Sequence, residues 1–126
     1  MIAGTMDPRV IARTVALGRI LIGAGLLAKP ELFTVSWIGS DAKRPGPQVL
    51  SRALGARDLV LGAGAISSDD GDLQGWLLAA TAADCTDLLA TVLSGDGVPL
   101  RGRIIVGASA LGGAALGLTA LVGLNR

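Results

Sequence analysis

Five charged residues lie inside apolar segments of this sequence, and their types and spacing can do chemistry. Arg57 and Asp58 are adjacent near the middle of one segment, Arg19 lies near the middle of the segment before it, and Asp84 and Asp87 lie near the middle of the segment after it. Asp84 and Asp87 are three residues apart, so they share one face of a helix. Charges of both signs therefore converge at one depth, which predicts a buried ionic network between helices.

A membrane location makes these charges costly. An Arg or Asp at the centre of a membrane helix costs about 2.5 to 3.5 kcal/mol, whereas a Leu or Ile favours insertion by only about 0.3 to 0.6 kcal/mol. The formal charges of Arg19, Arg57, Asp58 and Asp84 sum to zero, so pairing between helices can offset the cost. Such a network either fixes the order and alignment of the helices or carries protons, ions or a polar substrate. The sequence leaves both interpretations open.

The composition favours the bilayer over a soluble core. About half of the residues are apolar (51%), Gly occurs 19 times, and the aromatic residues are limited to Phe33, Trp37 and Trp76. Membrane helices tolerate Gly and pack through small residues, because close backbone approach supplies their van der Waals contact. The 11 Lys and Arg residues nearly balance the 10 Asp and Glu residues. This balance leaves no basic surface for nucleic acid, which we do not expect as a partner.

Several kinds of chemistry are excluded by the residue types that the sequence lacks. It has no His and a single Cys, Cys85. One chain therefore cannot build a His-ligated haem, a zinc site of the Cys and His type, a Ser-His-Asp triad or an intrachain disulfide. We expect no catalytic residue, no metal site and no cofactor.

Four apolar segments are long enough to cross a bilayer, at about residues 10–28, 49–66, 76–93 and 104–124. A helix of 19 residues rises roughly 28 Å, which is close to the hydrocarbon thickness. The predicted fold class is therefore all-α: a single integral membrane domain over residues 1–126, built as a four-transmembrane-helix bundle. Because Arg19 interrupts the first apolar run, we expect an uncleaved span there and not a signal peptide.

The connections suggest how the spans are anchored. Residues 31–48 combine a short apolar patch with a Pro-rich charged run, which predicts a short interfacial element between helices 1 and 2. A strand is the less favoured conformation for this element. Trp37 in this element and Trp76 at the start of the third span are candidate interfacial anchors, since indole prefers the headgroup level. Residues 67–75 are expected to form an acidic turn, and residues 94–103 a second turn.

The last span carries no charge and contains Gly113-x-x-x-Gly117, a spacing that favours close helix packing. Its partner is either another helix of the same chain or a second copy. Counting basic residues favours a location of both termini outside, because the first and third connections share one side and are the more basic. These connections hold Lys29, Lys43, Arg44, Arg101 and Arg103, whereas the termini hold Arg9 and Arg126.

The first two helical spans also resemble each other in part. A displacement of 39 residues places Arg13 on Arg52 and residues 23–25 on residues 62–64. This similarity indicates either a duplicated helix motif or a coincidence of composition, and no repeat of a two-helix unit is evident. Arg13 and Arg52 lie near span ends, where their side chains can extend to the headgroups and need no partner.

The same two spans carry short motifs of Arg and Gly: Arg13, Gly18, Gly23-x-Gly25 and Lys29-Pro30-x-x-Phe33, followed by Arg52, Gly55, Arg57 and Gly62-x-Gly64. This set resembles the small bacterial four-helix membrane proteins of the DoxX-like group, which includes members of unknown function. The composition, rich in Ala, Gly and Arg, is also similar to that of actinobacterial membrane proteins. The resemblance implies a four-helix bundle that accompanies a redox or transport complex. It transfers no catalytic residue, and it offers no counterpart for the acidic pair of the third span.

These observations favour a multi-pass protein of the cell inner (plasma) membrane that serves as a non-catalytic subunit or scaffold of a membrane complex. Its expected partners are the lipid bilayer and either further copies of itself, as a homo-oligomer, or a larger complex. The alternative is a small transporter or channel that uses the ionic network as its polar path. An enzyme acting on lipid or quinone would have only the carboxylates to work with. A compact soluble helical domain is the remaining interpretation.

Overall fold

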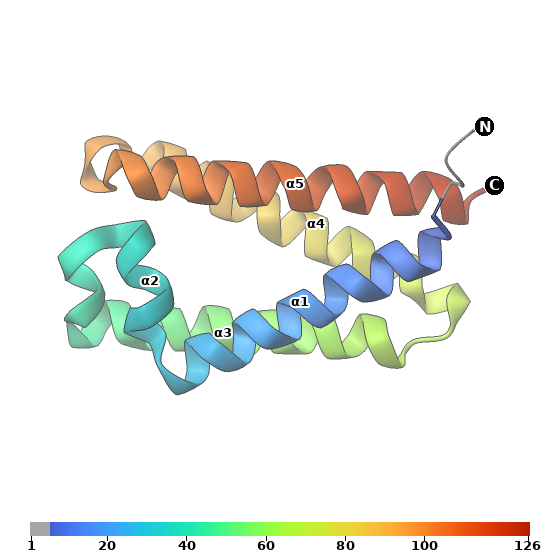
Figure 1. Cartoon of the computed structure of the whole chain (residues 1–126), viewed down its shortest axis with the longest axis horizontal. Helices are drawn as coiled ribbons and strands as arrows, with labels where there is room; N and C mark the ends of the chain where they lie inside the picture. The colour runs from blue at the N-terminus through green and yellow to red at the C-terminus, as the bar shows by residue number, and fades with distance from the viewer. Residues whose placement is uncertain (1–5) are drawn as a thin grey trace.

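The computed structural model of the chain describes residues 6–126, which form five α-helices and two short 3₁₀ helices (Figure 1). The all-α class predicted from the sequence is confirmed. In chain order the elements are α1 (Pro8–Ala28), α2 (Pro30–Ile38), η1 (Gly39–Lys43), α3 (Pro45–Ser67), α4 (Asp70–Leu93), η2 (Gly95–Gly97) and α5 (Leu100–Leu124).

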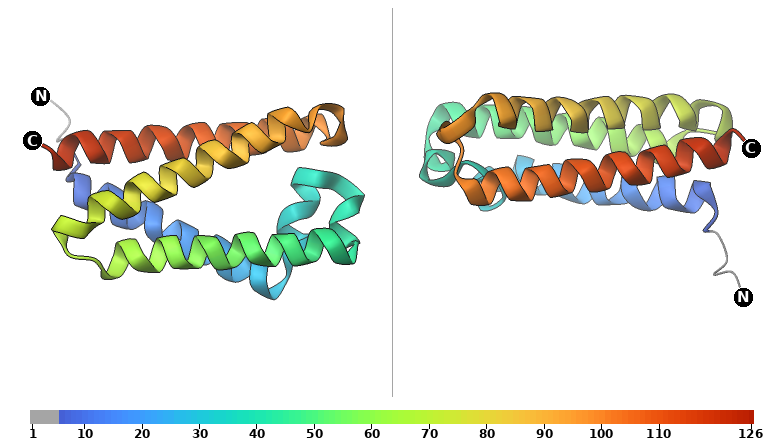
Figure 2. Two further views of the ribbon diagram at one scale, coloured as in Figure 1. Left: turned by 180° about the vertical axis from the view of Figure 1, so that it is seen from behind. Right: turned by 90° about the horizontal axis from the view of Figure 1, so that it is seen from above.

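The four long helices form two pairs that diverge from one end of the molecule. α1 packs against α3, and α4 packs against α5. The pairs lie close together at the end that holds both termini, and they separate toward the opposite end, where α2 lies between them (Figure 1). The view from behind in Figure 2 shows the same divergence. The first and third connections therefore lie at one end of the bundle, and the second connection lies at the other.

Local capping explains why the helices begin earlier than the apolar segments suggest. Pro8 and Pro45 occupy the first turns of α1 and α3, where a missing backbone N–H and a fixed φ are tolerated. The Asp69 side chain accepts a hydrogen bond of 3.0 Å from the backbone N–H of Asp72. Asp70 and Asp72 then lie in the first turn of α4, where their charge favours the helix N-terminus. The predicted acidic turn at 67–75 is thus mostly helix.

The short element between the first two long helices is itself a helix. α2 begins at Pro30, and its Thr34 hydroxyl donates a 2.7 Å hydrogen bond to the Pro30 carbonyl. It ends at Ile38 and is followed by Gly39, whose φ of 73° lies in the region that favours glycine. A turn of 3₁₀ helix then leads into α3.

The α1 and α3 backbones approach closely through small residues. A Cβ atom added to Gly23 would lie 2.6 Å from the Gly55 carbonyl oxygen, and one added to Gly55 would lie 2.8 Å from the Gly23 carbonyl oxygen. A Cβ atom on Gly62 would lie 2.6 Å from the Ala16 carbonyl oxygen. Only residues without larger side chains allow this separation, which is how membrane helices gain contact area.

These contacts repeat under the displacement of 39 residues. The buried residues of α1 are 12, 16, 23 and 26. When 39 is added to each of these numbers, the result is a buried residue of α3: 51, 55, 62 and 65. The displacement also converts the Gly23–Gly55 contact into the Gly62–Ala16 contact. Because the two helices run antiparallel, the pair has approximate two-fold symmetry.

Two arginines follow the same symmetry. Arg13 Nη1 donates a 2.8 Å hydrogen bond to the Ile66 carbonyl near the end of α3, and Arg52 Nε donates a 3.3 Å hydrogen bond to the Leu27 carbonyl near the end of α1. Both arginines therefore have a partner within the bundle, which was not predicted from the sequence. A helix C-terminus presents unpaired carbonyls and a partial negative charge, which attract a cation.

The similarity lies mostly within the paired helices. Of the 31 positions from residue 8 to residue 38, seven carry the same residue type 39 positions later, and the last of these matches is Trp37 with Trp76. Six of the seven matches lie within residues 8–25, so the similarity is concentrated in α1 and α3.

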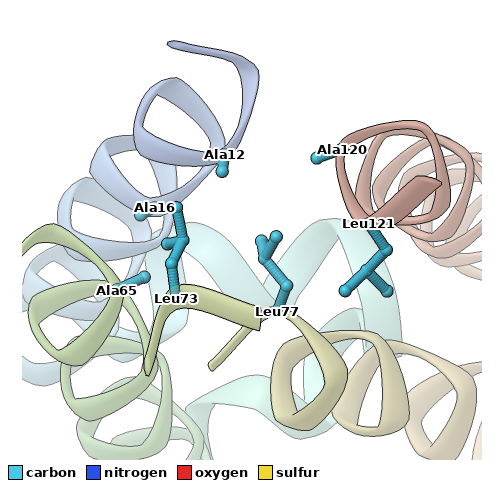
Figure 3. Close-up of a cluster of buried hydrophobic side chains, with 7 residues drawn as sticks. All are labelled: Ala12, Ala16, Ala65, Leu73, Leu77, Ala120 and Leu121. Carbon is cyan, nitrogen blue, oxygen red and sulfur yellow. The ribbon is translucent and has the colours of Figure 1, made fainter. Parts of the chain in front are cut away.

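The end of the bundle that holds the termini is closed by an apolar cluster drawn from all four long helices (Figure 3). Leu73 of α4 lies beside Ala16 and Ala65 and is fully buried, and Leu77 projects between α1 and α5. The other members are Ala12, Ala16, Ala65, Ala120 and Leu121.

Three helices are long and apolar enough to cross a membrane, namely α1, α4 and α5. Large apolar side chains also cover the outer surface, including Leu21, Leu50, Leu93 and Leu111, each more than half exposed. Exposed apolar surface on this scale is typical of a protein that contacts lipid. The structure is thus compatible with a membrane protein with three candidate spans.

Substitution of Gly23 or Gly55 by Ala should destabilise the α1–α3 pair. The new methyl group would meet backbone atoms that cannot move independently, and overpacking of this kind costs about 1 to 3 kcal/mol. Thermal unfolding in detergent measures the effect. Gly112→Ala is the matched control, because a Cβ atom there meets nothing within 4 Å. Equal stability of all three variants would contradict the close approach.

Candidate functional site

The five charged residues predicted from the sequence meet in one cluster where α1, α3 and α4 approach one another. Arg19 Nη1 donates a 3.1 Å hydrogen bond to Asp58 Oδ1. Arg19 Nη2 bonds to Asp84 Oδ2, and it also lies 3.1 Å from the Ala80 carbonyl oxygen. One guanidinium group from α1 thus connects α3 with α4.

Arg57 makes the second set of contacts. Its Nη1 and Nη2 atoms donate to both oxygens of Asp87 at 2.8 and 2.7 Å, a bidentate geometry that favours strong pairing. Nη2 also lies 3.3 Å from Asp58 Oδ1. Asp58 Oδ1 therefore accepts from both arginines and joins the two ion pairs into one network.

Helix geometry explains how these side chains converge. Arg57 and Asp58 are adjacent, so they project about 100° apart around α3: Arg57 reaches Asp87 of α4, and Asp58 faces Arg19 of α1. Arg19 and Asp58 are also related by the displacement of 39 residues, which places this pair on the approximate two-fold axis.

The cluster is shielded from solvent to different degrees. The side chains of Arg19 and Asp58 are only 11% and 12% exposed, whereas that of Arg57 is 30% exposed. The Arg19–Asp58 pair is therefore the innermost part of the network, and its breakage would strand a charge with little access to water.

The charge balance differs from the neutral layer expected from four residues. Asp87 is an integral member of the network because it holds Arg57 through both oxygens. Two arginines and three aspartates give the cluster a formal charge of −1. The sequence analysis placed Asp87 on the correct face but did not count it in the balance.

A cavity of about 400 Å³ adjoins the cluster and extends toward the α2 end of the bundle. All five charged residues line it. The remaining wall is mostly apolar and comes from α1, α2, α3 and α5: Val15, Gly18, Ile22, Leu26, Phe33, Thr34, Ser36, Trp37, Leu54, Ile105, Val106, Ser109, Ala110 and Gly113. The sequence analysis missed this apolar wall, because its members look like any other apolar residues of the spans.

Hydrogen bonding within the cluster is incomplete. Among the residues that the structure describes, none donates a hydrogen bond to Asp58 Oδ2 or to Asp84 Oδ1. Arg19 Nε and Arg57 Nε are also buried, and no described residue offers either atom an acceptor. Unpaired polar atoms beside a cavity are the groups that water or the polar part of a ligand would satisfy.

Gly113 and Gly117 pack inside the chain, against α4. A Cβ atom on Gly113 would lie 2.6 Å from Asp84 Oδ2, and one on Gly117 would lie 2.7 Å from the Thr81 hydroxyl oxygen. The two glycines therefore let α5 approach the acidic face of α4. Gly113 also makes room for the Asp84 carboxylate.

The two tryptophans make contacts within the bundle in addition to any role at an interface. Trp37 is half-buried and lines the cavity, and its backbone carbonyl packs tightly against Gly102 of α5. The Trp76 ring lies over Gly64, where an added Cβ atom would be only 2.5 Å away. Trp76 also packs against the apolar cluster.

Comparisons with known proteins leave this site without a counterpart: no family model matches the chain, and no curated protein or solved structure is significantly similar to it. The resemblance to the DoxX-like group rests on the short motifs alone.

The excess negative charge predicts that loss of a cation is more damaging than loss of an anion. Arg57→Met would change the net charge of the cluster from −1 to −2 and leave Asp87 without its partner. Because this pair is partly exposed, the cost should be at most about 3 to 5 kcal/mol, the range for a fully buried pair. Asp87→Asn would make the cluster neutral and keep one acceptor for Arg57, so it should cost less. Equilibrium unfolding in detergent compares the two variants, with Arg44→Met at an exposed position as the control. A less stable Asn variant would contradict the charge balance.

Proposed function

We propose that this chain is a small membrane transporter that binds a polar or charged solute at its ionic cluster. The observation that carries the proposal is the cavity of about 400 Å³, which all five charged residues line. A network that served only to align helices would not need a cavity beside it. Ionisable groups within a membrane domain are also functional candidates by default, because their insertion is costly.

The proposal treats α3 as a fourth span in addition to the three apolar helices. α3 has 23 residues and packs along α1, and a helix of this length rises roughly 34 Å, enough to cross the hydrocarbon. Its central charges lower its hydropathy, but Asp58 is buried and Arg57 is paired. The polar groups of α3 thus face the interior of the bundle, not lipid.

We further propose a multi-pass location in the cell inner membrane with both termini outside. Basic residues concentrate at the α2 end of the bundle, at Lys29, Lys43, Arg44, Arg101 and Arg103, which favours a cytoplasmic position for this end. The cavity would then extend from the centre of the bilayer toward the cytoplasm.

The approximate two-fold symmetry supports transport. Many transporters are built from repeats of inverted topology, and they bind substrate near the bilayer midplane, where the repeats meet. Here the Arg19–Asp58 pair lies at the contact between the repeated helices, and Arg19 is one residue from the midpoint of α1. The apolar cluster around Leu73 and Leu77 closes the opposite side of the site. A site open toward one side only is what alternating access requires.

The role of a non-catalytic scaffold is the rival proposal. The main sequence feature in favour of a scaffold was the pair Gly113 and Gly117. Both glycines pack against α4 of the same chain. Self-association or assembly into a larger complex would therefore use other surfaces, such as the lipid-facing side chains of α5.

The substitution Asp84→Asn separates the two proposals. The Asn side chain can still accept a hydrogen bond from Arg19, and the cluster becomes neutral, so folding and membrane insertion should persist. Purified protein in proteoliposomes is tested for solute-induced currents with a panel of small cations, anions and zwitterions. We expect at least one solute to produce a current, and we expect Asp84→Asn to reduce it at least tenfold without loss of thermal stability.

The control is Asp96→Asn, at a fully exposed side chain (104%). Currents that are absent from the wild-type protein for the whole panel would overturn the proposal. Currents that Asp84→Asn leaves unchanged would also overturn it.

A further inference from the structure

The charge of the cluster indicates the sign of its ligand. Two guanidinium groups face three carboxylates, so the cluster has one negative charge in excess. An unbalanced charge is costly where little water is present to solvate it. A monovalent cation that enters from the cavity would bring the net charge of the cluster to zero, whereas a monovalent anion would bring it to −2.

The free carboxylate oxygens indicate where the ligand would bind. Asp58 Oδ2 and Asp84 Oδ1 accept no hydrogen bond within the described residues 6–126. Asp58 is more than nine-tenths buried, and its side chain and that of Asp84 retain 12% and 16% exposure where they line the cavity. Two acceptors with no donor therefore border the same space. The buried donors Arg19 Nε, Arg57 Nε and Trp37 Nε1 also lack a partner, and they would need a separate acceptor such as water.

The rest of the cavity indicates what the ligand carries beside its charge. Ile22, Leu26, Phe33, Ile105 and Val106 form its apolar wall. Its volume of about 400 Å³ falls at the lower end of the range of about 300 to 1,000 Å³ for small-molecule sites. A compact molecule with an apolar body fits this wall better than a small hydrated ion does.

We propose that the cavity binds a protonated primary amine with a compact apolar body, whose ammonium group donates hydrogen bonds to Asp58 and Asp84. This inference rests on the proposed function and names the class of its solute. An ammonium group has three donors and no acceptor, which matches two free carboxylate oxygens. A bare Ca²⁺ ion would need about six to eight oxygen ligands, and the described residues contain no group of three or more acidic, His or Cys side chains that could hold a metal ion.

The test uses the full chain in lipid nanodiscs at neutral pH and isothermal titration calorimetry with three matched probes. 2-Phenylethylamine is the cationic probe, 2-phenylethanol is its neutral analogue, and phenylacetate is an anionic analogue. Empty nanodiscs correct for partition into lipid. We expect the amine to bind at least tenfold more tightly than either analogue.

Two variants link this binding to the site. Asp84→Asn should weaken amine binding at least tenfold, and Asp96→Asn should leave it unchanged. Val106→Phe fills the cavity from α5 without altering any charge, and it should abolish amine binding. Val106→Phe keeps the test decisive if Asp84→Asn does not fold.

The outcomes distinguish this inference from the proposed function. Equal binding of the alcohol and the amine, lost in Val106→Phe, would overturn the ammonium site and leave a ligand-binding cavity. Failure of the amine to bind, together with a proton current that requires Asp84, would overturn the amine and leave transport through the cluster. Amine binding that neither cavity variant changes would overturn the proposed site.

Discussion

The shared carboxylate of Asp58 is the interaction on which the rest of the structure depends. One of its oxygens accepts from Arg19 of α1 and from Arg57 of its own helix. Each arginine then reaches an aspartate of α4. The two helix pairs, α1 with α3 and α4 with α5, are therefore connected by charge. Apolar packing closes the bundle on one side of this connection, and the cavity occupies the other.

Small residues make this arrangement of charge feasible. Gly23, Gly55 and Gly62 bring the backbones of α1 and α3 together, and this approach holds Arg19 within reach of Asp58. Gly113 has the matching role in α5, where its missing side chain leaves space for the Asp84 carboxylate. Each of these glycines therefore has a specific structural role. They bring helices close enough for short-range ionic contacts and leave room for the charged groups.

Much of this arrangement could be predicted from the sequence. The five charged residues were identified because charge inside an apolar segment demands a partner, and the spacing of Asp84 and Asp87 fixed their common face. The start of α4 was less predictable, since capping by Asp69 extends this helix beyond the apolar run. The partners of Arg13 and Arg52 were missed because backbone carbonyls leave no signal in a sequence. The cavity was missed for a similar reason: it results from the divergence of two helix pairs, which no local pattern encodes.

The most direct test of the central claim is the stability of Asp58→Ala in detergent, measured by equilibrium unfolding beside Asp96→Ala. Removal of the shared carboxylate takes one acceptor from each arginine, while Arg19 keeps Asp84 and Arg57 keeps Asp87. A lost hydrogen bond to a charged group costs about 1.5 to 3 kcal/mol. We predict a loss of at least this size for Asp58→Ala and no loss for Asp96→Ala, whose side chain is fully exposed. Equal stability of the two variants would contradict the claim that the ionic cluster holds the helix pairs together.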